Sequence, residues 1–255
     1  MRIKKIIKSV LKSFGYMCVK VKTLEEKKNK SIEKFSLNSG ERQTSTKLDG
    51  IRKDHLSRYV VVSDFYNKLE LDTSNLFGMD IFCGNGYGSY FITENMGCKI
   101  ISIDASNEAI SLANKHYSND NTFFTVKEFP FDIPSNAFDF VISFETIEHL
   151  EDDIKLISKL TASLKKGGYL FISAPNEDVC NFEPNMYKFH IKHYTFKEIN
   201  ELVCFNDNFE LITWFGNGAY NFEGGKFVSN REENEMFMKE KVFDSHLTYV
   251  FRKNE

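Results

Sequence analysis

Short apolar runs alternate with segments of helical period along most of this 255-residue chain. In the helical segments apolar residues recur every three or four positions, whereas the apolar runs are short and bounded by turn residues. The predicted strands span 76–82, 99–103, 122–126, 138–144, 169–174, 209–214 and 247–251. The predicted helices span 55–69, 89–95, 107–116, 152–164 and 196–204. Because parallel strands need crossover connections, the alternation predicts an α/β fold, a doubly wound Rossmann-like sheet of seven strands with an antiparallel pair at one edge.

Residues 1–15 follow a different pattern. Apolar residues from Ile3 to Phe14 keep helical spacing while lysines occupy the rest of the wheel, so the pattern predicts a basic amphipathic helix as an N-terminal extension. It is shorter than the roughly 20 apolar residues that span a bilayer. Three roles stay open: lying on a membrane surface, binding a partner, or packing on its own domain or a second copy.

Two regions are therefore predicted. Residues 1–50 hold the basic helix and a polar, lysine-rich linker or lid, and residues 51–255 form the α/β domain. The domain carries an insertion at about 216–245, whose glycines and aromatic residues predict a mobile active-site loop. A short surface helix is predicted within it at 231–241.

Charge is unevenly spread along the chain. Residues 1–34 hold eleven Lys and Arg against three Glu, whereas residues 35–255 hold twenty-two basic and thirty-three acidic side chains. An acidic body argues against a broad nucleic-acid groove, although the basic leader can still reach phosphates or anionic lipid. The five cysteines form no C-x-x-C pair and no signal peptide precedes them. We expect a cytoplasmic protein with reduced thiols, peripheral to the inner membrane if residues 1–15 bind it, and either monomeric or oligomeric.

The segment GMDIFCGNGYG carries the clearest chemistry. An apolar strand containing Asp80 runs into Gly84, Gly86 and Gly88, which let the backbone turn sharply and approach a ligand at the N-terminus of the next helix. The G-x-G-x-G spacing differs from the G-x-G-x-x-G of dinucleotide sites. Asp104 ends the next strand, twenty residues after Gly84, where a carboxylate can bind a ribose diol. A helix-capping role is the alternative for Asp104.

Together with the FDFVIS and KKGGYLFIS strands, these motifs resemble the class I S-adenosylmethionine-dependent methyltransferases over about residues 55–214. The resemblance implies that the three glycines cradle the methionyl part of S-adenosylmethionine, Asp80 helps to hold its amino group, and Asp104 binds its ribose. Phe144 and Glu145, at the end of the fourth strand, are expected against the cofactor. Glu128 or Asp132 is expected near the adenine, although the spacing there departs from the family pattern.

A finer resemblance covers GERQTSTKLDGIRKDHLSRYVVVSDF. It is similar to methyltransferases of bacterial surface-polysaccharide pathways, which share a Gly-Glu-Arg and a His-x-x-Arg-Tyr element. Carried over to this chain, the resemblance implies that five residues close over the cofactor: Glu41, Arg42, His55, Arg58 and Tyr59. A solvated helix face is the alternative for His55 and Arg58.

The run SFETIEHL follows the fourth strand. Glu145, Glu148 and His149 are spaced i, i+3 and i+4, so on a helical first turn they share one face, and two carboxylates with an imidazole can ligate a divalent metal. A fourth ligand is expected from His190, with His193 as the alternative. The pattern resembles metal-dependent O-methyltransferases of small-RNA 3′ ends and ubiquinone precursors, and implies Mg²⁺ or Mn²⁺.

Coordination to a divalent cation makes the alkoxide of a hydroxyl accessible at neutral pH. Without a metal, His149 or His190 can act as the general base, and a purely structural role for the run is the third alternative. We therefore expect an O-methyltransferase that, with divalent-metal assistance, acts on a sugar hydroxyl of a bacterial surface-glycan precursor, either nucleotide-linked or lipid-linked. A quinone-precursor phenol, an RNA terminal ribose, or a non-catalytic cofactor-binding subunit are the other functions considered.

Overall fold

The computed structural model describes residues 37, 42–205 and 208–254. The predicted basic helix at 1–15, Glu41 and most of the predicted linker lie outside these residues. Among the residues that the structure describes, no helix combines the length and the apolar character needed to cross a bilayer.

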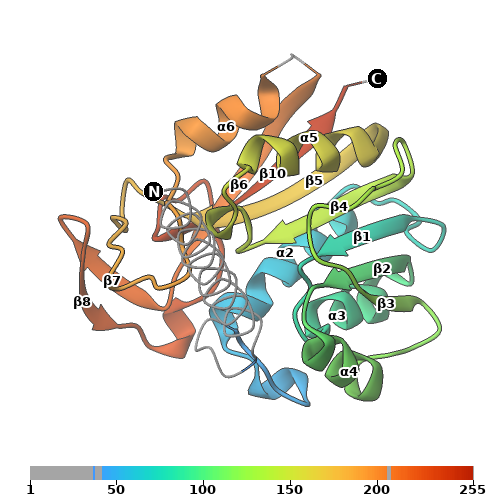
Figure 1. Ribbon diagram of the computed structural model, residues 1–255, viewed down its shortest axis with the longest axis horizontal. Helices are drawn as coiled ribbons and strands as arrows, with labels where there is room; N and C mark the ends of the chain where they lie inside the picture. The colour runs from blue at the N-terminus through green and yellow to red at the C-terminus, as the bar shows by residue number, and fades with distance from the viewer. Residues whose placement is uncertain (1–36, 38–41, 206–207, 255) are drawn as a thin grey trace, which may run out of the picture. The chain divides into compact units, whose positions relative to one another are not determined.

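One mixed sheet forms the centre of the domain (Figure 1). Its strand order is β3-β2-β1-β4-β5-β10-β6-β9. The strands are β1 (Phe77–Ile81), β2 (Lys99–Asp104), β3 (Thr122–Val126), β4 (Phe138–Phe144), β5 (Leu164–Pro175), β6 (Phe209–Asn217), β9 (Lys239–Glu240) and β10 (His246–Lys253). Strands β1 to β5 are parallel to one another, and β10 runs antiparallel between β5 and β6. The seven predicted strands and the antiparallel edge are confirmed, and β9 adds a short eighth strand.

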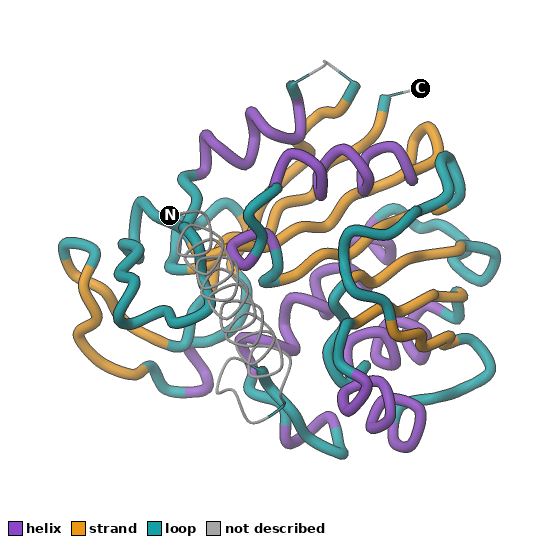
Figure 2. The backbone as a smooth tube through the Cα atoms, in the orientation of Figure 1, coloured by secondary structure: helices purple, strands orange, loops and turns teal. Residues whose placement is uncertain are grey.

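Helices cover both faces of this sheet (Figure 2). The helices are α2 (Lys53–Lys68), α3 (Tyr87–Met96), α4 (Asn107–His116), α5 (Asp153–Ser163) and α6 (Phe196–Cys204), with single 3₁₀ turns η1 (Leu48–Gly50), η2 (Ile147–His149) and η3 (Glu233–Glu235). Helices α2 and α3 share one apolar cluster with Phe140 and Ile142 of β4, whereas α5 and α6 pack on the face that carries Val141. Successive residues of a strand point to opposite faces, so a strand covered on both sides reads as a continuous apolar run.

Local chemistry explains where the helices begin. Ser106 Oγ accepts a hydrogen bond from the Ala109 N–H at 3.2 Å and caps α4. Asp152 caps α5 in the same way, and Thr195 opens α6 with a capping box. The N-cap of α3 is instead Gly86, whose φ of 82° is in the left-handed region that favours glycine.

The insertion at 216–245 differs from the prediction. It folds as a hairpin of β7 (Tyr220–Glu223) and β8 (Lys226–Asn230), followed by η3 and β9. The predicted helix at 231–241 is wrong, because only one 3₁₀ turn forms and residues 239–240 pair with the edge of β6. The backbone groups at that edge need partners, and the Lys241 N–H donates to the Trp214 carbonyl at 2.9 Å.

The C-terminal end of α5 also differs. The prediction extends this helix to Leu164 and ends it with Lys165 to Gly168, but the helix ends at Ser163 and β5 begins at Leu164. The Lys-Lys-Gly-Gly segment lies inside β5, where a shift of register with β4 accommodates it.

Candidate active site

Three acidic side chains meet at the carboxyl edge of the parallel strands. Asp80 lies in β1, Asp104 ends β2, and Glu145 follows β4. From β1 the chain adds β2 and β3 on one side of the sheet, and then β4 and β5 on the other side of β1. The topological switch point therefore lies between β1 and β4, and ligands bind at such points in open α/β sheets. The loop after β1 is anchored there because the N–H groups of Phe82 and Cys83 donate to the Ile103 carbonyl at 2.6 and 3.0 Å.

The three glycines of this loop have different surroundings. A Cβ on Gly84 would meet nothing within 4 Å, so this glycine borders open space. A Cβ on Gly86 would overlap the Phe124 ring, and one on Gly88 would lie 2.0 Å from the Tyr59 ring. Glycine at 86 and 88 therefore permits close packing behind the loop, and Gly84 is the one that faces the space where a ligand can lie.

Asp104 organises the floor of the site and is almost fully buried. Its Oδ2 accepts from the Gly84 N–H and from Arg42 Nη1, both at 3.0 Å, and its Oδ1 accepts from the Ser106 N–H at 2.8 Å. Ser106, not Asp104, is the N-cap of α4. A carboxylate has about four acceptor positions, so Asp104 retains capacity for a ribose hydroxyl.

Asp80 lies deeper, with 1% of its surface exposed. Its Oδ2 accepts from Ser89 Oγ at 2.7 Å and from the Tyr59 hydroxyl at 3.3 Å. Burial raises the pKa of Asp80 to about 7, although the two hydroxyl hydrogen bonds oppose the rise. A cation beside Asp80, such as the ammonium group of an amino acid, would lower this pKa again.

Tyr59 and Phe144 line the same region. The Tyr59 ring packs edge-on against Phe144, with ring centroids 5.0 Å apart, and against Tyr87 at 5.6 Å. Burial raises the pKa of Tyr59 well above its usual value, so the phenol stays protonated and donates to Asp80. Tyr59 therefore borders the glycine loop at Gly88, and Phe144 packs on Tyr59.

Glu145 has a different environment from the predicted one. Its φ of 49° is left-handed, so it stands outside η2 and does not share a helical face with Glu148 and His149; that part of the prediction is wrong. Its carboxylate accepts from Ser173 Oγ at 2.7 Å and lies 3.2 Å from His246 Nε2 and 3.6 Å from Arg58 Nη2. Burial opposes ionisation, but the Arg58 charge lowers the pKa of Glu145 to about 2.

Arg58 and His55 form the wall beside Glu145. The Arg58 side chain is 2% exposed, and its Nη1 lies 3.3 Å from His55 Nδ1. Burial, with the Arg58 charge, lowers the pKa of His55 to about 3, so this imidazole is neutral at pH 7. A solvated helix face is therefore wrong for Arg58, which is the buried cation of the site.

Glu148, His149 and His190 form a second group. Each offers one metal-binding atom, and these atoms all lie within 4.8 Å of one another. The Ile191 N–H donates to the Glu148 carbonyl at 2.7 Å, which holds the loop that carries His190 against η2. Three of the four predicted metal ligands thus come together, while Glu145 lies outside this group and pairs with Arg58.

His193 is not a member of the group. It is 3% exposed, its Nδ1 lies 2.7 Å from the Cys180 carbonyl, and its Nε2 lies 2.9 Å from His190 Nδ1. Burial lowers the pKa of His193 to about 4. Both of its ring nitrogens are engaged, which leaves His190 as the histidine of this loop that reaches Glu148 and His149.

Two contacts of Glu145 were not predicted from the sequence. Ser173 lies inside the apolar run of β5, and His246 opens β10 opposite Pro175. The signal for His246 is topological: in an antiparallel strand the first residue, not the last, lies at the ligand-binding edge. Asp132, expected near the adenine, is fully exposed and pairs with Lys159 at 3.3 Å.

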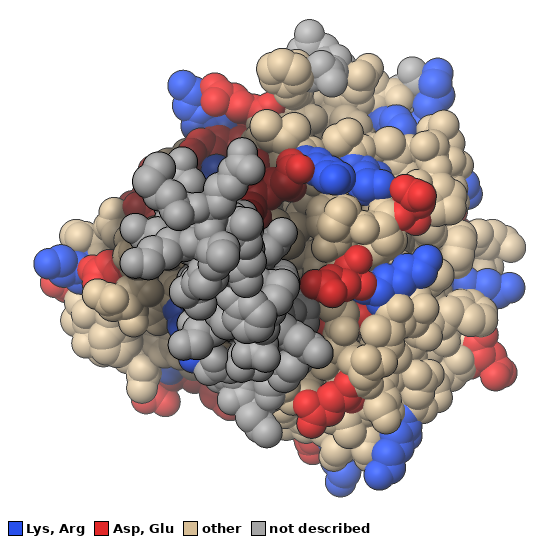
Figure 3. Space-filling model, in the orientation of Figure 1, with Lys and Arg blue, Asp and Glu red and all other residues tan. Residues whose placement is uncertain are grey.

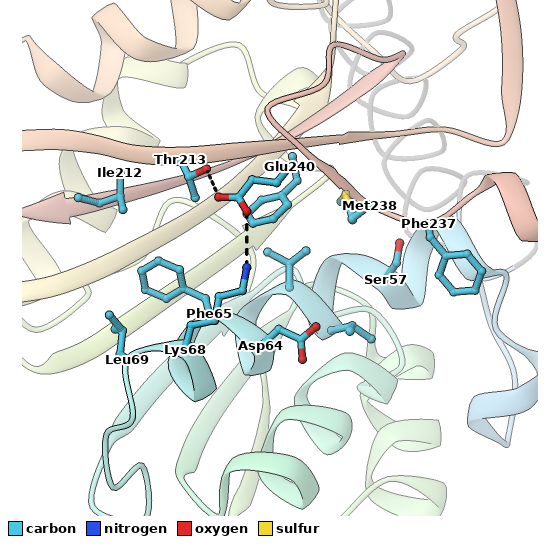
Figure 4. Close-up of a pocket in the computed structure, with 13 residues that line it drawn as sticks. Ser57, Asp64, Phe65, Lys68, Leu69, Ile212, Thr213, Phe237, Met238 and Glu240 are labelled. Carbon is cyan, nitrogen blue, oxygen red and sulfur yellow. Dashed lines mark hydrogen bonds and ion pairs between the residues drawn. The ribbon is translucent and has the colours of Figure 1, made fainter.

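A separate groove of about 490 Å³ lies between α2 and the β6–β9 edge (Figure 4). Glu240 crosses it, 2.9 Å from Thr213 Oγ1 and 3.5 Å from Lys68 Nζ. None of the acidic or histidine residues of the candidate site described in the paragraphs above, from Asp80 to His246, lines this groove. On the face shown in Figure 3, the acidic and basic side chains of the described residues are interspersed.

The sequence matches a family model described as a methyltransferase domain over residues 55–226, about two thirds of the chain. This chain belongs to that methyltransferase family. The match contains β1, the glycine loop, Asp104 and the Glu148–His190 region. The methyltransferase is of the class I type that uses S-adenosylmethionine, in agreement with the Rossmann-like sheet and with its relatives.

Curated relatives of this methyltransferase differ in their acceptors. A probable S-adenosylmethionine-dependent methyltransferase of Mycolicibacterium smegmatis is 28% identical over 48% of this chain and 47% of its own length. A phosphoethanolamine N-methyltransferase of Plasmodium falciparum is 29% identical over 53% of this chain and 51% of its own. A ubiquinone biosynthesis O-methyltransferase of Paraburkholderia phymatum is 28% identical over 41% of this chain and 46% of its own.

The methyltransferase therefore spans about half the length of these relatives or less. Among solved structures, an S-adenosylmethionine-dependent methyltransferase from Mesorhizobium loti superposes with a TM-score of 0.55 at 13% identity, covering 76% of this chain and 100% of that one. At that identity the likeness shows the fold.

Proposed function

We propose that this methyltransferase transfers a methyl group from S-adenosylmethionine to a hydroxyl, in particular a sugar hydroxyl of a small glycan precursor, with help from a divalent cation. The observation that carries the proposal is the group formed by Glu148, His149 and His190. An alcohol holds its proton too tightly to react readily at pH 7, so O-methylation needs a base or a cation near the acceptor. Two imidazoles and a carboxylate can either act as the base or bind the cation.

The donor set fits a cation such as Mn²⁺. Mn²⁺ accepts imidazole nitrogen together with carboxylate oxygen, whereas Mg²⁺ prefers an all-oxygen shell, so two histidines favour Mn²⁺ of the two predicted ions. Ligand atoms around such a cation lie about 3 Å apart, given bond lengths of about 2.1 Å. The three groups, now within 4.8 Å of one another, would therefore move closer together when a cation binds. Bound there, the cation would lower the pKa of a coordinated hydroxyl.

The remaining residues have distinct parts in this proposal. Asp104 and Gly84 hold the ribose side of the cofactor, and Asp80 holds its ammonium group, because these are the acidic and backbone groups beside the open glycine loop. Arg58 keeps Glu145 ionised, so that Glu145 can accept a hydrogen bond from a hydroxyl of the cofactor or the acceptor. His149 or His190 receives the acceptor proton when no cation is bound.

The glycan acceptor is supported by the resemblance of the N-terminal approach to polysaccharide-pathway methyltransferases. Two residues from that segment, Arg42 and Tyr59, contact Asp104 and Asp80. The membrane contact proposed for residues 1–15 would bring the protein to lipid-linked precursors. Sedimentation with anionic vesicles, with and without residues 1–15, tests that contact; equal sedimentation of the two proteins would refute it.

N-methylation of a phosphorylated ethanolamine is the second candidate, because a relative 29% identical over 143 residues is named for that reaction. An amine loses its proton far more easily than an alcohol, so N-methylation would need no metal at Glu148. Methyl transfer to phosphoethanolamine, but not to sugar or catechol acceptors, would establish this candidate in place of O-methylation.

Chelation tests the metal. Activity toward nucleotide-linked sugars and a model catechol should fall at least about 10-fold in EDTA and return with Mn²⁺ and less fully with Mg²⁺. His190→Ala and the control His116→Ala, a histidine at the far end of α4, complete the set. Activity that ignores EDTA but is lost in His190→Ala would reject the metal and leave a histidine base.

A further inference from the structure

His193 lies at the centre of the loop between β5 and α6. A chain of hydrogen bonds runs from the Cys180 carbonyl to His193 Nδ1 at 2.7 Å, and from His193 Nε2 to His190 Nδ1 at 2.9 Å. The sequence prediction treats His193 only as an alternative ligand to His190. The direction of the hydrogen bonds gives it a different role.

The carbonyl sets that direction. A carbonyl oxygen can only accept, so the proton between Cys180 and His193 must sit on His193 Nδ1. A neutral imidazole carries one proton, and therefore His193 Nε2 holds a lone pair and must accept from His190 Nδ1–H. In its neutral form His190 then has its own lone pair on Nε2.

The surroundings of His193 favour the neutral ring because its burial opposes a charge, although two carboxylates, Glu177 and Glu145, act in the other direction. Glu177 Oε2 lies 3.9 Å from His193 Nδ1, beyond hydrogen-bond distance, and favours a charged ring. The His193 side chain is fully buried and packs against the Phe182 and Tyr187 rings, with centroids 5.4 and 4.6 Å away. An apolar enclosure of this kind disfavours the imidazolium form.

The same segment fixes the plane of the His190 ring. Tyr187 stacks on His190, with centroids 5.0 Å apart and an interplanar angle of 18°. The Tyr187 hydroxyl lies 2.9 Å from Cys180 Sγ, so Cys180 anchors both His193 and the residue that stacks on His190.

His149 shows the same arrangement from the other side of the group. Its Nδ1 lies 3.0 Å from the Phe189 carbonyl, which again places a proton on Nδ1 and, in the neutral ring, leaves the lone pair on Nε2. Nε2 lies 3.8 Å from Glu148 Oε1. Two histidines forty-one positions apart in the chain thus carry the tautomer that a metal ligand or a general base requires at Nε2.

We propose that His193 is a positioning residue that holds His190 in the Nδ1–H tautomer and so directs the His190 Nε2 lone pair toward Glu148, His149 and the acceptor. The inference rests on the proposed function for the use of that lone pair. The tautomer itself can be measured without turnover.

Long-range ¹H–¹⁵N correlation spectra of the full-length apoprotein assign the protonated nitrogen of each histidine. His190, His193 and His149 are expected in the Nδ1–H form, whereas an exposed histidine in water prefers Nε2–H. A wild-type His190 that carries its proton on Nε2 overturns the proposal, whatever the activity.

His193→Phe keeps a ring of similar size but removes both hydrogen bonds, and His193→Gln keeps an acceptor that can reach His190 Nδ1. In His193→Phe we expect mixed His190 tautomers and a loss of about 10- to 100-fold in turnover or in Mn²⁺ affinity, with S-adenosylmethionine affinity unchanged. His193→Gln should recover most of that loss, and the control His116→Phe should show none. Thermal melting confirms that each variant is folded before it is compared.

Two outcomes separate the inference from the proposed function. If His190 keeps the Nδ1–H form in His193→Phe, His193 does not set the tautomer and the inference is wrong. If the tautomers behave as expected but His190→Ala retains full activity, the positioning stands as a structural fact and the proposed use of His190 fails.

Discussion

The residues proposed for the cofactor side are distributed along the chain very differently from those proposed for the acceptor side, to which we add His246 as the partner of Glu145. Asp80, Gly84 and Asp104 fall within twenty-five consecutive residues, whereas Glu148, His190 and His246 are spread over about one hundred. The cofactor side is built from one strand–loop–helix unit and the end of the next strand. The acceptor side needs η2, the loop before α6 and the start of an antiparallel strand to come together. Neighbours in sequence can be recognised as a motif, while residues joined only by folding cannot.

The comparison predicts that the two sides can be disabled separately. The largest expected effect is on the acceptor side: His190→Ala or Glu148→Gln should lower kcat by about 10²- to 10⁴-fold, because either change removes a base or a metal ligand. The dissociation constant of S-adenosylmethionine should stay within about threefold, since the glycines of the loop are surrounded by Asp104, Phe124 and Tyr59. Steady-state kinetics and calorimetry measure the two quantities, and a large loss of cofactor affinity would show that the sides are not independent.

The opposite variant should disable the cofactor side. Asp104→Ala removes the acceptor of three hydrogen bonds and leaves Arg42 and the Gly84 N–H without it. Loss of the charge-assisted bond to a ribose hydroxyl should weaken S-adenosylmethionine binding by about 10- to 100-fold, as measured by calorimetry. Asp132→Ala, at an exposed carboxylate paired with Lys159, is the matched control. Unchanged affinity in Asp104→Ala would remove the ribose role.

Asp80, on the proposed cofactor side, should make the stability of the folded protein depend on pH. Its pKa of about 7 lies above the ordinary value of 3.8, so the folded protein keeps the proton between about pH 4 and 7 while the unfolded chain releases it. The stability that results is fully present below pH 4 and is lost as the pH rises through 7, by about 4 kcal/mol at most. Urea unfolding of wild type and Asp80→Asn across this range checks the sign, since the variant should lack this slope.

Cofactor binding should lower the raised pKa of Asp80. The ammonium group of S-adenosylmethionine beside Asp80 favours the carboxylate, so binding below pH 7 should release up to one proton from this group. Calorimetry in buffers with different ionisation enthalpies measures the release. Binding with no proton released at pH 6 would place the ammonium group elsewhere.

The smallest effect separates the glycines of the loop. Gly88→Ala puts a Cβ 2.0 Å from the Tyr59 ring and should destabilise the fold by about 1–3 kcal/mol through overpacking. Gly84→Ala meets no neighbour and should cost only about 1 kcal/mol, from its φ of 58°. If Gly84→Ala were the more destabilising variant in urea, the packing argument would fail; it should instead be the one that weakens cofactor binding.

Most of the fold followed from the apolar pattern. The strands at 122–126 and 138–144 and the helices at 107–116 and 196–204 have the predicted bounds, because a sheet covered on both faces leaves long apolar runs and capped helices leave Ser, Asp or Thr at their starts. The predicted helix at 231–241 is wrong because its three apolar residues, Met236 to Met238, are consecutive and form no helical stripe, and because Lys239 and Glu240 pair with the edge of β6 as a strand. The prediction that Glu145 shares a helical face with Glu148 and His149 is wrong, because the backbone of Glu145 is left-handed and residue spacing alone cannot show this.

The sequence by itself determined the α/β fold class and the positions of the glycine loop, Asp80 and Asp104, and it predicted S-adenosylmethionine as the cofactor, because these features lie in contiguous segments with local geometric requirements. Only the tertiary structure decided that His190 rather than His193 joins Glu148 and His149, and that Ser173 and His246 join Glu145. Those choices depend on strand order, on the antiparallel direction of β10 and on which way buried hydrogen bonds must run. None of these is a property of any single stretch of the chain.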